Sequence, residues 1–219
     1  MRSEQSLQDD PWTREEKEVL DTLKTPEKIQ AYLDSIPYND EITCRSPRRV
    51  LRDHKAHCME GALFAAAALM RIGFPPLLLD LGAVRDDDHV LALIFREGGC
   101  GAVAKSNYSG LRYRAPVYRG LRELVMSYFE DYFNPLGERT LRTYSRPLSL
   151  TDGIRSDWRT TEEDLDCIGD RLNRQVHYRL LTTAQENDLV PVDGRTLAAG
   201  LLGSNPEGLY RCDEAVRDA

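Results

Sequence analysis

The sequence lacks several features that define common protein classes. It contains no run of about 18 apolar residues, and its first residues, MRSEQSLQDDPW, include no apolar signal segment. We therefore expect a cytoplasmic protein with no membrane partner. Positive charge is not in excess, because 29 Lys and Arg residues oppose 36 Asp and Glu residues and the net charge is −7. A surface of this charge repels phosphate, so we expect no chain-wide binding of nucleic acid.

Metal-binding and disulfide patterns are also missing. The five cysteines are odd in number and have no CxxC spacing, which predicts free thiols. His54, His57 and Cys58 lie close together, but their spacing matches no zinc module and no HExxH occurs. Three aspartates at 86–88 precede His89 without the glycine and glutamate of an EF-hand loop, which is typical of a solvated loop. We predict no metal and no cofactor.

The first third of the chain has start signals for three short helices. Thr13 and Glu16 have capping-box spacing, and Thr25 and Ser46 each precede a proline. Apolar residues that would face a core follow these signals: Leu20, Leu23, Ile29, Tyr32, Leu33, Val50 and Leu51. We interpret these helices as packing elements.

The centre of the chain predicts a buried helix followed by an antiparallel hairpin. The run AHCMEGALFAAAALM is apolar on every side, so we expect an enclosed helix from Cys58 to Ile72, with Gly73 as its stop. PPLLLDLGAV and HVLALIF predict strands, and REGGCG joins the second to AVAKSN. Residues 118–133 predict a helix on one side of the sheet, TLRTYSRPLSL one more strand, and 165–176 a last amphipathic helix.

A nucleophile and a base can be placed on these elements. Cys58 falls in the first helical turn, where free N–H groups and the helix dipole favour the thiolate, although Glu60 opposes this. His89 opens a strand and can reach the helix start as a general base. If the hairpin loop centres on Gly98, His89 lies opposite Asn107, which would orient the imidazole. A shifted centre would bring Tyr108 or Ser109 there instead.

Two further expectations concern charge at this site. The oxyanion of an acyl-transfer reaction would be held by the backbone N–H of Cys58 and a second donor, for which His57 and Asn39 are candidates. The aspartates at 86–88 would raise the pKa of His89 and stabilise an ion pair with the thiolate.

Each site residue also has a plain structural interpretation. Cys58 can be a small buried hydrophobe, His89 a surface residue at the edge of a strand, and Asn107 a turn residue. The stretch KSNYSGLRYRAPVYRGLR gathers Lys and Arg among tyrosines. It could bind a nucleic-acid strand or form a basic rim for an acidic substrate, and a salt-bridged surface is the third interpretation.

AHCMEGALFAAAAL, DDDHVLALIF, a glycine turn and AVAKSN, in this order, resemble the core of the transglutaminase-like superfamily over about residues 40–150. The resemblance implies an α+β, papain-like fold in which a buried helix that begins with the cysteine packs on an antiparallel sheet. It implies a catalytic triad of Cys58, His89 and Asn107, although many members carry Asp at the third position. Met59 stands where eukaryotic cross-linking enzymes have tryptophan, which argues against protein cross-linking.

SPRRVL, KSNYSGLRYR, SYFEDYF and TLRTYS extend the similarity to a small bacterial branch of that superfamily without an assigned function. We expect a thiol-dependent hydrolase or acyltransferase that attacks a peptide or another amide-containing substrate and passes the acyl group to water or an amine. The alternative is a catalytically silent binding or scaffold module. We predict an N-terminal helical extension at 1–40, a core at 41–150 and a C-terminal helical extension at 151–219 that packs on the core, with a boundary near Pro147–Gly153.

Overall fold

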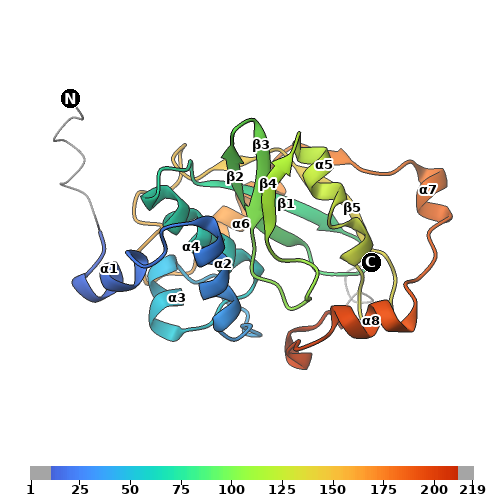
Figure 1. Cartoon of the computed structure of the whole chain (residues 1–219), viewed down its shortest axis with the longest axis horizontal. Helices are drawn as coiled ribbons and strands as arrows, with labels where there is room; N and C mark the ends of the chain where they lie inside the picture. Colours follow the sequence, from blue (N-terminus) through green and yellow to red (C-terminus); the bar gives the residue numbers. More distant parts are fainter. Residues whose placement is uncertain (1–10, 212–219) are drawn as a thin grey trace.

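The computed structural model describes residues 11–211, which form an α+β fold with eight α-helices and a seven-stranded antiparallel sheet (Figure 1). The first ten residues, on which the expectation about a signal segment depends, lie outside the described part. The helices are α1 (Arg14–Leu20), α2 (Pro26–Ser35), α3 (Pro47–Asp53), α4 (Cys58–Arg71), α5 (Leu121–Met126), α6 (Asp166–Asn173), α7 (Thr183–Asn187) and α8 (Gly194–Gly200). The strands are β1 (Leu77–Ala83), β2 (His89–Arg96), β3 (Gly99–Val103), β4 (Arg114–Tyr118), β5 (Leu141–Ser145), β6 (Leu148–Ser149) and β7 (His177–Arg179). Two 3-10 turns, η2 (Phe129–Asp131) and η3 (Pro206–Gly208), complete the elements that the site uses.

The predicted helix starts are confirmed. The Thr13 hydroxyl accepts a hydrogen bond from the Glu16 N–H at 3.3 Å, and the Glu16 carboxylate accepts the Thr13 N–H at 2.7 Å. Thr25 and Ser46 cap α2 and α3 in the same way, each followed by proline at the first helical position. These caps satisfy N–H groups that a helix start leaves without partners, so they act locally and can be recognised in the sequence.

Helix α4 is enclosed as predicted. Its residues Met59–Leu69 are all buried, and it lies between α2, α3 and the sheet. Gly73, with φ of 92°, follows its C-terminus. Gly61 lets the first turn of α4 approach the backbone after β3, because a Cβ at this position would lie only 2.3 Å from Cβ of Lys105.

The sheet has the strand order β4-β3-β2-β1-β5-β7, and β6 pairs with β1 beside β5. In the β2–β3 hairpin, Arg96 pairs with Gly99, and Glu97 and Gly98 both have positive φ, as a two-residue type I′ turn requires. The prediction that the loop centres on Gly98 is therefore wrong by half a residue. In the observed register the residue opposite His89 would be position 106 rather than 107, and the β2–β3 pairing ends at Val103 before it reaches that point.

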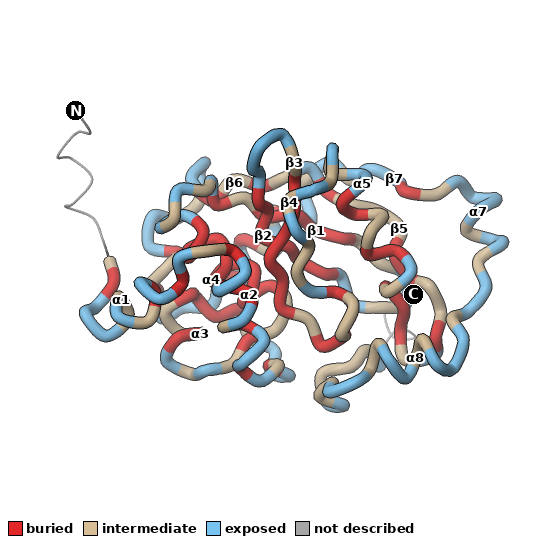
Figure 2. Tube along the Cα trace, viewed as in Figure 1, coloured by how far each residue is buried: buried red, intermediate tan, exposed pale blue. Residues whose placement is uncertain are grey.

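Each face of the sheet has its own hydrophobic core, because successive strand residues point to opposite faces. Leu78, Ala92 and Ile94 face the core that contains α4. Leu79, Leu91 and Leu93 face the second core, which contains α5 and the tyrosines after it. Figure 1 shows the sheet between α1–α4 on one side and α5 and α8 on the other, and Figure 2 shows that burial is greatest in α4 and the central strands.

Two predicted helices differ in extent from the structure. The helix expected over residues 118–133 is only α5 and the turn η2, because the chain leaves the helix at Ser127. The last expected helix ends at Asn173, and Val176 is exposed. Apart from Val176 and the half-buried Leu121, both segments bury their expected apolar residues, which are Leu124, Val125, Tyr128, Phe129, Tyr132, Leu165, Ile168 and Leu172.

The described chain after residue 150 forms the helices α6, α7 and α8 and the strand β7. Helix α6 packs into the core around α4, and β7 pairs with β5 at the edge of the sheet. The boundaries at residues 40 and 150 stay predictions. Among residues 11–211 no helix combines the length and the apolar character needed to cross a membrane.

Candidate active site

Cys58 is the first residue of α4, and His57 caps this helix. The His57 ring accepts the Met59 N–H at Nδ1 (3.2 Å), and its Nε2 lies 2.6 Å from the Thr43 carbonyl oxygen. The Glu60 carboxylate completes the capping box by accepting the His57 N–H at 3.0 Å. Both ring nitrogens of His57 are therefore engaged in holding the helix start, and they do not face Cys58 as oxyanion donors.

Glu60 anchors the loop before α4. Its carboxylate is fully buried and binds the Arg45 guanidinium (3.1 Å), the Thr43 hydroxyl (2.8 Å) and the Asn39 amide (3.0 Å). Burial alone would raise the pKa of Glu60, but the nearby His57 and the N–H groups of Arg45 and His57 hold it below its usual value. The side chains of both candidate oxyanion donors are therefore engaged elsewhere, His57 at the helix start and Asn39 with Glu60.

The Cys58 thiol is half-buried and protonated. Its Sγ lies 3.7 Å from the carbonyl oxygen of Asp88, to which it donates. Burial raises the pKa of Cys58 to about 12, the charges of Asp87 and Asp80 act in the same direction, and the N–H groups of Val90 and Met59 oppose them. The prediction that the helix start favours the thiolate is wrong in this structure, because burial has the larger effect.

His89 is buried and neutral. Its Nε2–H donates to the carbonyl oxygen of Leu111 at 2.9 Å, which leaves Nδ1 without a proton and able to accept one. Burial lowers the pKa of His89 to about 4, and the positive charge of Arg114 contributes, although the Leu111 carbonyl opposes them. The edge of the ring packs on Tyr132, with centroids 6.4 Å apart.

The aspartates do not raise the pKa of His89, contrary to the prediction. Burial raises the pKa of Asp86 to about 7 and that of Asp80 to about 6, and burial also raises the pKa of Asp88. The Thr140 hydroxyl donates to Asp86 at 2.7 Å, and His177 binds Asp80 at 3.0 Å. Asp86 is partly protonated near neutral pH, which weakens its field, and Asp87 and Asp88 are exposed to solvent that screens theirs.

Asn107 binds the C-terminal segment. Its side-chain amide donates to the carbonyl oxygens of Asn205 (2.8 Å) and Gly208 (2.9 Å), and its carbonyl oxygen accepts the Asn205 N–H at 2.7 Å. Among residues 11–211 no hydrogen bond joins Asn107 to His89. The orienting position predicted for Asn107 is filled by the Leu111 carbonyl, which is a backbone group and leaves no signal in the sequence.

The three predicted residues nevertheless line one cavity. Cys58, His89 and Asn107 surround a space of about 30 Å³, with Tyr38 and Tyr132 beside them. This volume holds a water molecule and no substrate. The structure therefore brings the predicted residues together around a small cavity, and within the described chain no hydrogen bond joins Cys58 to His89.

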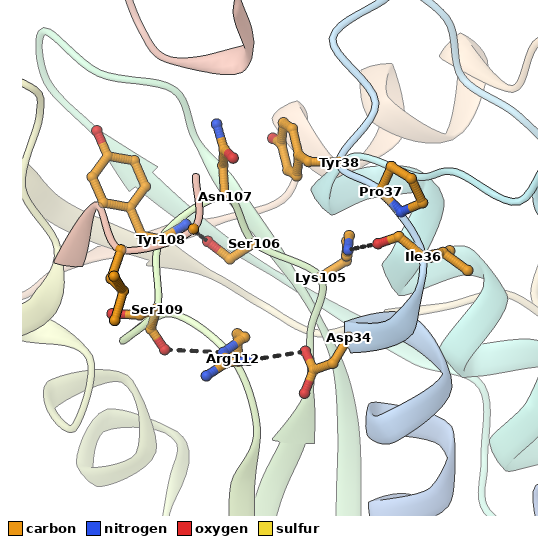
Figure 3. Close-up of a pocket in the computed structure, with 12 residues that line it drawn as sticks. Asp34, Ile36, Pro37, Tyr38, Lys105, Ser106, Asn107, Tyr108, Ser109 and Arg112 are labelled. Atoms are coloured by element: carbon orange, nitrogen blue, oxygen red, sulfur yellow. Dashed lines mark hydrogen bonds and ion pairs between the residues drawn. The ribbon is translucent and has the colours of Figure 1, made fainter. Parts of the chain in front are cut away.

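A larger, polar cavity of about 200 Å³ adjoins the first one and shares Tyr38, Ser106 and Asn107 with it. Figure 3 shows Asn107 and Tyr38 at one end of this cavity and Asp34 with Arg112 at the other. Lys105 lies between them; its Nζ donates to the carbonyl oxygens of Leu33 (2.8 Å) and Ile36 (2.6 Å) at the end of α2. Burial lowers the pKa of Lys105 to about 8.

The basic stretch around residue 112 is largely paired within the molecule. Arg112 lies 3.4 Å from Asp34, Arg114 lies 3.3 Å from Asp131, and the Tyr113 hydroxyl donates to Glu27 at 2.9 Å. These contacts favour the salt-bridged interpretation of the stretch.

The other cysteines and the metal-binding candidates lie apart from this chemistry. Cys44 and Cys100 are buried, Cys167 is exposed, and Cys212 lies outside the described residues. Within residues 11–211 no group of three His, Cys, Asp or Glu side chains is arranged to hold a metal ion.

Sequence comparisons with known protein families and with curated proteins find no match to this chain.

Proposed function

We propose that the protein is a thiol-dependent hydrolase or acyltransferase of the transglutaminase-like, papain-like type, with Cys58 as the nucleophile, His89 as the base and a peptide-like amide as the substrate. One observation carries the proposal. Cys58 and His89 come from the starts of α4 and β2 to line the same cavity, and the Leu111 carbonyl holds His89 in the tautomer whose Nδ1 can accept a proton.

The pKa values keep the Cys58 thiol and the His89 imidazole neutral before the attack, so the proton moves only as Sγ bonds to the substrate. Because the thiol and the imidazole are both neutral, His89 Nδ1 takes the Cys58 proton as Sγ bonds to the amide carbon. The resulting tetrahedral oxyanion collapses, the carbon–nitrogen bond breaks, and the leaving amine takes the proton from His89. Water or another amine then attacks the thioester, with His89 again as the base, and the thiol is released.

Tyr38 supports the oxyanion position. Burial keeps its pKa well above the usual value, so its hydroxyl stays protonated, and it interacts with the backbone N–H of Cys58. A carbonyl oxygen beside Sγ would replace the Tyr38 oxygen as the acceptor of the Cys58 N–H and would accept the Tyr38 hydroxyl proton as a second hydrogen bond, as acyl transfer requires.

Trapping of the acyl-enzyme tests the proposal. Peptide amides are incubated with the protein in hydroxylamine, which converts a thioester to a hydroxamate that mass spectrometry detects. We expect hydroxamate from the wild-type protein and none from Cys58→Ala, with Cys167→Ala as the matched control because this cysteine is exposed and lines neither cavity of the site. Equal product from Cys58→Ala and wild type would contradict the proposal.

The second candidate function is a binding module without turnover. The raised pKa of Cys58 and the small size of the cavity beside it favour this function. Alkylation by iodoacetamide at neutral pH distinguishes the two functions, because an activated Cys58 reacts faster than Cys167 and an inactive one reacts more slowly.

A further inference from the structure

The C-terminal segment of the described chain covers the candidate site. Gly208 lines the small cavity together with Cys58 and His89, and Leu202 and Gly203 line the polar cavity beside it. The segment between them therefore crosses both cavities and forms part of the wall that leaves room for only a water molecule.

Asn107 holds this segment through backbone atoms alone. Its side-chain amide accepts the Asn205 N–H and donates to the carbonyl oxygens of Asn205 and Gly208. None of these three hydrogen bonds involves a side chain of the segment. Asn is suited to this contact because its side chain carries both an acceptor and two donors. Ser109 makes two similar contacts, since its N–H donates to the Gly200 carbonyl (2.9 Å) and its hydroxyl to the Ala199 carbonyl (2.7 Å).

Steric fit restricts which residue can stand at position 208. A Cβ on Gly208 would lie 2.8 Å from the Tyr38 ring and 3.3 Å from the Asn107 amide nitrogen. Contacts this short require the segment or the ring to move. The site therefore accepts a glycine where the bound chain passes Tyr38.

We propose that the surface beside Cys58, formed by Tyr38 and Asn107, is a peptide-binding groove, and that residues 205–208 occupy it as an intramolecular ligand. Asn107 is the residue that recognises the peptide backbone, and a glycine must face Tyr38. This inference rests on the proposed function, for which it names the substrate class: a polypeptide segment with a turn that resembles Asn-Pro-Glu-Gly. A substrate peptide binds only after the internal segment has left.

The segment is held weakly enough to leave. None of the residues 181–211 is buried, and the turn η3 is stabilised by a local contact, in which the Asn205 side chain accepts the Glu207 N–H at 3.2 Å. Elements with few buried contacts open at low free-energy cost.

The first experiment releases the segment in the full chain. Gly208→Ala introduces the steric conflict with Tyr38, and Gly194→Ala is the matched control because a Cβ there meets no atom within 4 Å. We expect the rate at which iodoacetamide alkylates Cys58 to rise about tenfold or more in Gly208→Ala and to change less than about twofold in the control. An unchanged rate in folded Gly208→Ala protein would overturn the inference.

A second variant covers the case in which Gly208→Ala fails to fold. Asn107→Asp keeps the acceptor for the Asn205 N–H but replaces the donor with an oxygen that repels the Asn205 and Gly208 carbonyls. The same increase in Cys58 alkylation is expected, and circular dichroism confirms the fold of each variant.

The second experiment supplies the ligand from outside. The peptide SNPEGLYR, which corresponds to residues 204–211, carries a fluorescent dye, and its anisotropy reports binding to the Gly208→Ala chain. We expect binding, protection of Cys58 from alkylation, and weaker binding of SNPEALYR by about tenfold. Absence of binding would overturn the inference.

Repeating the hydroxamate assay with the Gly208→Ala chain separates this inference from the proposed function. Peptide binding, with a Cys58 that is alkylated faster than in wild type but forms no hydroxamate, supports the groove and contradicts the nucleophile. A reactive Cys58 that no peptide protects contradicts the groove alone.

Discussion

Helix α4 with strands β1–β3, and the segment of residues 181–211, meet at the candidate site but are held in place differently. Residues Ala62–Leu69 of α4 are almost completely inaccessible to solvent, whereas no residue of the C-terminal segment is buried. The segment is held by hydrogen bonds to residues 107 and 109 and by half-buried leucines that pack on the second core. The difference indicates that a rigid part positions Cys58 and His89 and that a less stable part controls access to them.

The largest expected effect concerns the chemistry of the rigid part. Replacing His89 with Ala removes the base while Leu111 loses only one hydrogen-bond donor, so we expect hydroxamate formation from a peptide amide to slow by about 100-fold to 10,000-fold. The rate is measured by mass spectrometry of the product. His177→Ala, a histidine in β7 whose Nε2 binds Asp80, is the control, and an equal loss in both variants would show that the effect is structural.

The second prediction compares the stabilities of the two parts. Phe64 is fully buried in α4 and stacks on Tyr32, with ring centroids 4.9 Å apart. Phe64→Ala should lower the free energy of unfolding by about 3–5 kcal/mol, because it removes buried apolar surface and leaves a cavity. Leu202→Ala, at an exposed position of the segment, should change it by less than about 0.5 kcal/mol. Urea unfolding measures both, and similar losses would contradict the distinction between the two parts.

The third prediction concerns pH. Because folding raises the pKa of Asp86 to about 7, this group stabilises the fold only while it is protonated, and its contribution is lost as pH rises from its unfolded value near 4 through 7. Asp86→Asn removes this dependence, so the variant should gain about 1–3 kcal/mol relative to wild type between pH 4 and pH 8.

Urea unfolding of both proteins at the two pH values measures this gain. His89 has the opposite effect on the pH dependence of stability. Because folding lowers its pKa, the fold becomes less stable as pH falls from about 6.5 to 4. Because both proteins contain His89, its contribution cancels in the comparison. A constant difference between them would contradict the assignment to Asp86.

The smallest expected effect comes from two helix caps. Thr25 caps α2, which packs on α4, and Thr25→Ala should lower the free energy of unfolding by about 1 kcal/mol. Asp193 caps α8 in the segment, where it accepts the N–H groups of Arg195 (2.9 Å) and Thr196 (3.1 Å). Asp193→Ala should leave global unfolding unchanged and speed amide exchange in α8 by about fivefold. Hydrogen exchange followed by mass spectrometry resolves the two effects, and an equal loss of global stability in both variants would indicate that α8 and the core unfold together.

The candidate site was only partly predictable. Cys58 and His89 could be placed because each stands at the start of an element with a strong local pattern, and the structure sets both against one cavity. The partner of His89 was not predictable, since it is a backbone carbonyl 22 residues away whose position depends on the loop after β3. The half-residue error in the hairpin register has a local origin, because both Glu97 and Gly98 adopt positive φ and form the two-residue turn.

The amino-acid sequence by itself determined the helix starts, the enclosed helix and the apolar strands of the hairpin, because caps and apolar runs involve residues a few positions apart. Only the tertiary structure decided the protonation states of Cys58 and His89 and the partner of Asn107. Burial determines the pKa of Cys58 more strongly than the helix start does, and it lowers the pKa of His89 although aspartates precede it. The residues that Asn107 binds lie 98 and 101 positions further along the chain. Desolvation of a side chain, and contacts between residues so far apart in the sequence, arise only when the whole chain has packed.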